Sequence, residues 1–285
     1  MLGALWLASC GALGDSGPDR DWPPPSPALW KATGPNGERA WLFGTIHALP
    51  DGVRWRTPEL DAAIAEADLL MVEISDLEGP NDAADAFEYW ASGNNLPPLL
   101  ERVPPEARPD VAALIEDAGR EERDFHHFDS WAAALMLGNA LRCSDASNGV
   151  DRALLREFDR AQSTESFDLQ FRMFDSLPDE AQADLLVTVA EERDCSAGEA
   201  RMLAWLTGDT DAMLASVETG FRGNADLRDT LLVRRNDWFT QRLARYQARF
   251  PHEAVLLAVG AAHLPGPDGV AAMLEREGYT VRRIQ

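Results

Sequence analysis

Two Gly-x-x-His motifs are the residues of this chain whose types and spacing most directly indicate chemistry. They have the sequences GTIH, from Gly44 to His47, and GAAH, from Gly260 to His263. Each follows an apolar run typical of a buried strand, so each histidine is expected in a loop just beyond a strand end. Neutral imidazole is a common ligand of transition metals, and glycine allows close backbone approach. Together the motifs predict one polar, metal-competent site.

Glu73 is expected to complete this site, because two histidines alone make an incomplete metal centre. It interrupts an otherwise apolar run, residues 69–74, near the carboxyl end of a predicted strand. A buried carboxylate without a partner is costly, so Glu73 should emerge at the same sheet edge as His47. It then acts either as a metal ligand or as a general base, and the sequence leaves both roles open.

Arg235 and Asn236 form a further polar pair, within a predicted helix over residues 231–250 that leads into the strand of the second motif. Two interpretations remain open for this pair. The side chains either bind a carboxylate, a phosphate or a substrate carbonyl, or they belong to a solvated helix face. His252 follows a proline, lacks the glycine framing of the two motifs, and is expected in an exposed turn.

The elements that must position these residues fall into two similar units. The first is predicted to contain strands at 28–32, 39–44 and 69–74 and a helix that begins at Thr57, and the second to contain a strand at 254–259, a helix at 268–276 and a strand at 279–284. Strand, loop, helix and strand in this order are typical of a βαβ crossover, which predicts parallel pairing. The predicted fold class is therefore α/β, with two related α/β half-units that form a mixed sheet core.

A large helical insert is predicted between the two units, from about residue 82 to residue 247. Its expected helices include residues 110–120, 130–141, 150–160 and 179–192, separated by breaks rich in Pro, Gly and Asp. With this insert, residues 28–285 are expected to form one domain.

The N-terminal segment, residues 1–27, has features of export. Its apolar run ends in Leu-Ala-Ser-Cys, which resembles a bacterial lipobox with Cys10 as the lipidated residue, and the stretch to Pro27 predicts a flexible tether. We therefore expect an extracytoplasmic protein, in the periplasm or at the cell surface, anchored to a bacterial membrane through Cys10. The alternative is an apolar tail with an unmodified cysteine. In an oxidising compartment, Cys143 and Cys195 either form one disulfide or remain two separate thiols.

Composition narrows the classes of partner. The 285 residues include 26 basic and 48 acidic side chains, a formal net charge of -22, and the acidic residues are spread along the predicted helices. Such a chain is not expected to bind nucleic acid. The sequence also contains no Gly-rich phosphate loop and no nucleophile elbow around a serine.

At these residues the chain resembles the TraB/GumN family, which is related to the Tiki metalloproteases of animals. The resemblance covers residues 29–284 and is strongest in residues 29–50, 67–75 and 259–284, around the two motifs and Glu73. Weaker family-like elements include Gly-Val-Asp at residues 149–151. One departure concerns Glu165, which aligns with a glutamate of the family, because the residues before it are polar where the family usually has an apolar strand.

The resemblance implies an α/β core made of two related halves and a site that both motifs build. The residues that it implies are His47, His263 and Glu73 as metal ligands, Glu73, Arg235 and Asn236 as catalytic residues, and Gly44, Gly260 and Glu165 beside the substrate. In the Tiki branch this site resembles a Mn- or Co-dependent peptidase centre. The implied cofactor is thus a divalent metal, Mn or Co, with Zn as an alternative.

Three functional hypotheses follow. The first is a metal-dependent hydrolase, specifically a peptidase that acts on exported peptides or proteins. The second is a non-catalytic extracytoplasmic binding protein that sequesters a peptide, a metal or haem through the same residues. The third is an anchored interaction domain whose site is vestigial.

Overall fold

A mixed sheet forms the base of the molecule. The computed structural model describes residues 21–77, 82–141 and 146–285, and this part of the chain contains a six-stranded sheet in the order β4-β3-β5-β2-β1-β6. Its strands are β1 (Leu29–Thr33), β2 (Arg39–Thr45), β3 (Leu69–Val72), β4 (Ala161–Ser163), β5 (Ala254–Gly260) and β6 (Thr280–Arg283). Strands β2, β5, β3 and β4 are parallel neighbours, whereas β1 is antiparallel to both β2 and β6. The predicted α/β class with a mixed sheet is confirmed.

The two half-units share an order of elements. Helix α1 (Pro58–Glu66) connects β2 to β3, and helix α12 (Val270–Arg276) connects β5 to β6. Helix α1 begins as predicted, with the Thr57 side chain accepting a hydrogen bond from the Leu60 amide at 3.2 Å and Pro58 in the first turn. Because β5 pairs with both β2 and β3, the two units interleave in one sheet and do not lie end to end.

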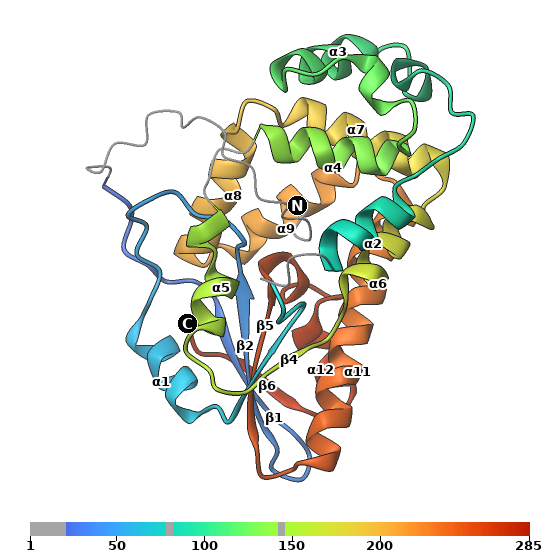
Figure 1. Ribbon diagram of the computed structural model, residues 1–285. Coiled ribbons are helices and arrows are strands. Elements are labelled where there is room, and N and C mark those ends of the chain that lie inside the picture. The colour runs from blue at the N-terminus through green and yellow to red at the C-terminus, as the bar shows by residue number, and fades with distance from the viewer. Residues whose placement is uncertain (1–20, 78–81, 142–145) are drawn as a thin grey trace.

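Each face of the sheet is buried under helices, which follows from the alternation of side chains along the strands. In β2, Trp41 and Phe43 pack in the core that contains α1, while Ala40 and Leu42 pack in the core that contains α12 and α11 (Arg234–Arg249). Figure 1 shows α1 on one side of the strands and α11 and α12 on the other. A sheet covered in this way leaves its strand ends as the place where polar side chains can gather.

A helical lobe stands over the carboxyl ends of the central strands (Figure 1). Its helices are α2 (Asp82–Trp90), α3 (Arg108–Asp117), α4 (Ser130–Ala140), α5 (Val150–Leu155), α6 (Phe167–Asp175), α7 (Asp179–Glu191), α8 (Ser196–Thr207), α9 (Thr210–Gly220) and α10 (Ala225–Arg228), with short 3₁₀ helices at Leu99–Arg102, Glu122–Phe125 and Ala146–Asn148. The lobe has a hydrophobic core of its own, in which the buried rings of Trp131 and Phe171 stack with centroids 6.0 Å apart. Helices α2, α3, α4, α6 and α7 pack in this core, whereas α5 and α8 pack in the core that contains α1, through Val150 and Trp205.

Strand β4 lies inside the segment that the sequence predicts as helical. The predicted helix over residues 150–160 is wrong beyond Leu155, where α5 ends. Residues 161–163 instead pair with β3, with Ala161 opposite Leu70, and the Thr164 amide continues the ladder to the Val72 carbonyl at 2.8 Å. The short polar segment thus becomes a strand because it pairs with the open edge of β3. Its composition alone does not predict a strand.

The described end of the predicted tether lies against the domain. The Ser26 amide donates to the Leu206 carbonyl at 2.7 Å, the Gln285 side chain donates to the Pro27 carbonyl at 2.7 Å, and Trp22 packs against the core under α1. Cys10 lies outside the described residues. In the part of the chain that the structure describes, no helix combines the length and the apolar character needed to cross a bilayer.

Gly44 gives the first prediction, because it sits where β2 meets the turn after β5. A Cβ atom at Gly44 would lie 2.8 Å from the Cα of Ala261, which is backbone and cannot move aside cheaply. We expect Gly44→Ala to lower the free energy of unfolding by about 1–3 kcal/mol, measured by urea denaturation. The matched control is Gly198→Ala, in helix α8, where an added Cβ meets nothing within 4 Å. This control should be neutral or stabilising by up to about 1 kcal/mol, and equal losses in both variants would contradict the packing role of Gly44.

Candidate functional site

The two Gly-x-x-His motifs leave the sheet side by side. Strands β2 and β5 are parallel neighbours, with Thr45 opposite Gly260 in the ladder. His47 and His263 therefore follow at the same edge of the sheet, under the helical lobe. The indole of Trp205, from α8 in the lobe, donates a hydrogen bond of 2.8 Å to the Gly44 carbonyl and fixes the end of β2. The expected convergence of the two motifs is what the structure shows.

His47 is held by a carboxylate from the lobe. Its Nδ1–H donates to Asp151 Oδ2 at 2.7 Å, and the same carboxylate accepts from the Thr45 hydroxyl at 2.8 Å. Helix α5 is brought to this place by the Val150 amide, which donates to the Ile46 carbonyl at 2.9 Å. The His47 side chain is 18% exposed, yet its Nε2 atom is buried and has no hydrogen-bond partner among the described residues. The orienting carboxylate thus leaves Nε2 as the atom that can act.

The charge of Asp151 decides the protonation of His47. Burial lowers the pKa of His47, but the negative charge and hydrogen bond of Asp151 outweigh it, so this pKa lies above its ordinary value. Burial raises the pKa of Asp151, and the interaction with His47 more than reverses this, so the carboxyl stays ionised. Sequence reasoning missed Asp151 as a site residue, although the Gly-Val-Asp element at residues 149–151 was the available signal.

Arg235 lies at the centre of a buried polar cluster. It is 7% exposed and Asn236 is 1% exposed, so the interpretation as a solvated helix face is wrong. The guanidinium forms a bidentate pair with Glu165, through Nε at 2.9 Å and NH2 at 2.7 Å, and NH2 also donates to Glu73. Its NH1 group reaches His263 Nε2 at 3.2 Å. Burial lowers the pKa of Arg235, but the carboxylates of Glu165 and Glu73 raise it by more than burial lowers it. The side chain therefore stays charged.

His263 is held as a neutral imidazole. Asn236 donates through Nδ2 to the Asp268 carbonyl at 2.7 Å, which leaves its Oδ1 to accept the Nδ1–H of His263, also at 2.7 Å. The Nε2 lone pair then faces Arg235. Burial and the positive charge of Arg235 place the pKa of His263 well below its ordinary value. Both ends of the Asn236 amide are bonded to protein, which favours a positioning role over the predicted contact with substrate.

Glu73 and Glu165 complete the cluster from neighbouring strand ends. Glu73 Oε1 accepts from the Gly260 amide at 2.7 Å, and a Cβ at Gly260 would lie 3.2 Å from that oxygen, a contact tighter than most. Glu165 follows β4 and is buried. Its Oε2 accepts from the Gln170 side chain at 2.8 Å, and its amide donates to the Glu73 carbonyl at 2.9 Å. The short strand β4 thus brings Glu165 to the site despite its polar sequence.

The chain segment just before Arg235 has an unusual backbone conformation. Residues 229–233 form a π-helical turn directly before α11, which begins at Arg234. Such turns are rare and occur frequently at functional sites, because the extra residue shifts the side chains that follow around the helix axis. Here the turn precedes the two adjacent side chains, Arg235 and Asn236, that both point into the protein.

The donor atoms at the site are of the chemical types that bind divalent cations. Imidazole nitrogens and a carboxylate are the ligands expected for Mn, Co or Zn, and the buried, unpartnered Nε2 of His47 is such a donor. The facing atoms of Glu73 and His263 are engaged by Arg235. Within the described residues, no three His, Cys, Asp or Glu side chains form a group that could hold a metal ion.

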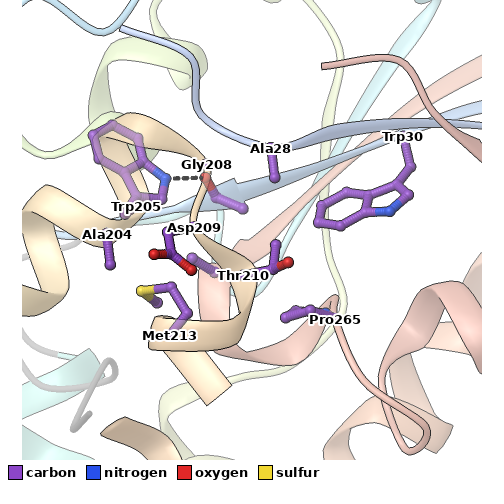
Figure 2. Close-up of a pocket in the computed structure, with 11 residues that line it drawn as sticks. Ala28, Trp30, Ala204, Trp205, Gly208, Asp209, Thr210, Met213 and Pro265 are labelled. Carbon is purple, nitrogen blue, oxygen red and sulfur yellow. Dashed lines mark hydrogen bonds between the residues drawn. The ribbon is translucent and has the colours of Figure 1, made fainter. Parts of the chain in front are cut away.

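Other features lie apart from this cluster. A small, mostly apolar pocket is bounded by Trp205 and Met213 (Figure 2), and also by Gly44 and Ala261, where the two motifs touch. Neither imidazole lines it. Cys195 is disulfide-bonded, and Cys143, its predicted partner, lies outside the described residues.

Comparison with known proteins gives one result. The model of the TraB/PrgY/gumN family matches residues 28–283, nearly the whole chain. No curated protein and no solved structure matches the chain.

The opposite environments of the two histidines give the second prediction. In the metal-free protein, His47 should titrate above and His263 well below the ordinary histidine pKa, followed by NMR of the imidazole signals and assigned with His47→Gln and His263→Gln. Asp151→Asn should lower the pKa of His47, because burial persists while the counter-charge is lost. Two histidines that titrate together near the ordinary value would contradict the assigned network.

Proposed function

The chain belongs to the TraB/PrgY/gumN family, and from this premise and the geometry of the site we propose that it is a metal-dependent hydrolase that acts on exported peptides or proteins. The proposal assigns a divalent cation, Mn or Co with Zn as an alternative, to His47, His263 and Glu73. These three side chains come from the ends of three adjacent strands, β2, β5 and β3.

The observation that carries the proposal is the Nε2 atom of His47. A buried polar atom without a hydrogen-bond partner is uncommon in folded proteins and calls for an explanation. The other ring nitrogen donates to the buried carboxylate of Asp151. Histidines that bind metals usually have this arrangement, in which a carboxylate fixes the tautomer and raises the basicity of the ligating nitrogen.

The surrounding side chains have separate tasks in this proposal. Asn236 holds the ring of His263 so that Nε2 faces Arg235, and the Gly260 amide fixes one oxygen of Glu73. When bound, the ion would polarise the scissile carbonyl and lower the pKa of a water molecule. Once Arg235 gives way, Glu73 has Oε2 left, which either holds the ion or accepts a proton, and Arg235 supplies positive charge beside the reacting carbonyl.

An extracytoplasmic location is part of the proposal. The disulfide at Cys195 supports it, because disulfides persist in oxidising compartments and are rare in the cytosol. The lipobox-like Leu-Ala-Ser-Cys supplies the anchor at Cys10. Substrates would then be peptides or proteins met at the membrane surface.

The third prediction tests metal and activity together. We expect the purified protein to bind about one Mn²⁺ or Co²⁺ per chain, measured by elemental analysis after dialysis, and to cleave members of a peptide library in a chelator-sensitive way. His47→Ala should lose the metal and reduce turnover by at least about a hundredfold, as expected when a metal ligand is lost. The control is His252→Ala, because His252 lies in an exposed turn outside both motifs.

Each outcome has a distinct meaning for the proposal. Stoichiometric metal with no cleavage would replace the hydrolase by a sequestering protein. Cleavage that survives both chelation and His47→Ala would remove the cation and the histidine from the reaction. Loss of activity in His252→Ala would show that the assay responds to general damage.

A further inference from the structure

The guanidinium of Arg235 lies against two of the three side chains to which the proposed function assigns a cation. It donates to Glu73 Oε2 and contacts His263 Nε2 at 3.2 Å, and these are two of the three proposed ligands. We propose that Arg235 is an internal competitor of the divalent cation, so that an ion enters only when the guanidinium releases Glu73 and His263. This inference rests on the proposed function and concerns how the site is regulated.

The competition follows from the donor atoms. A lone pair on His263 Nε2 that accepts a hydrogen bond from Arg235 cannot at the same time bind a metal. The same holds for the lone pair of Glu73 Oε2 that faces Arg235 NH2. A guanidinium and a divalent ion packed against the same ligands also repel each other, and a buried site screens this repulsion weakly.

Arg235 can stay paired with Glu165 when it releases Glu73 and His263. Its bidentate pair with Glu165 uses Nε and NH2 and does not involve His47, His263 or the backbone of the motifs. Gln170 holds Glu165 from the other side at 2.8 Å. Cation entry therefore breaks the contacts to Glu73 and His263 while the charge of Arg235 stays paired with Glu165.

The arrangement also lets the protein fold without a metal. With Arg235 in place, the buried carboxylates of Glu73 and Glu165 are neutralised from within the chain. Without it, these carboxylates would repel each other until a cation bound. The wild-type protein should thus gain little thermal stability from metal, and a protein without the guanidinium should gain much more.

The experiment compares Co²⁺ binding in the full-length wild-type protein and in Arg235→Met, followed by the visible absorption of Co²⁺ and by the shift of the melting temperature. We expect Arg235→Met to bind Co²⁺ at least tenfold more tightly and to show the larger thermal shift. Arg235→Lys, which keeps the charge without the bidentate fork, should fall between the two and serves if Arg235→Met does not fold. Arg234→Met is the matched control, since Arg234 is adjacent, exposed and paired with Asp229, and it should match the wild type.

The outcomes separate this inference from the proposed function. If the wild type binds Co²⁺ and both Arg235 variants bind it equally or more weakly, the competition is refuted while the metal site stands. Binding by the Arg235 variants but not by the wild type would support the competition and overturn the metal-dependent activity of the native chain. Absence of binding in every protein would overturn both.

Discussion

The buried guanidinium of Arg235 is the interaction on which the site depends. An arginine removed from water is tolerated only when its charge and its N–H groups are matched, and here two carboxylates and one imidazole provide the match. Removal of one partner from such a buried pair costs about 3–5 kcal/mol in other proteins. Because the cluster joins α11 to the ends of β3, β4 and β5, its charge balance also fixes how α11 sits against the carboxyl edge of the sheet.

The sheet supplies the reactive groups and the helices between β3 and β5 orient them. His47 and His263 come from the sheet motifs, whereas their partners, Asp151 and Asn236, come from α5 and from α11. One histidine is thereby paired with a negative charge and the other placed against a positive charge. Opposite environments of this kind move the pKa values of two chemically identical side chains apart, which is a common feature of functional sites.

Much of this architecture could be predicted from the sequence, because local patterns determine it. Strands β1 and β2, the helix start at Thr57 and the strand before Glu73 all carry strong local signals, and the repeated motif implied a shared sheet edge. The remaining features depend on distant partners. Asp151 contacts a histidine 104 positions away. Strand β4 forms because β3 offers it an edge, and Arg235 is buried because two carboxylates from other segments meet it.

The composition of β4 has a consequence beyond the site. Open sheet edges present unpaired N–H and C=O groups that can template pairing with another molecule, and proteins limit this hazard with short, polar or charged edge strands. Here one edge is the three-residue β4, Ala-Gln-Ser, and the other is β6, which ends in two arginines. Both edges would therefore resist intermolecular β-aggregation, and the polar sequence that makes β4 hard to predict as a strand would also protect the folded chain.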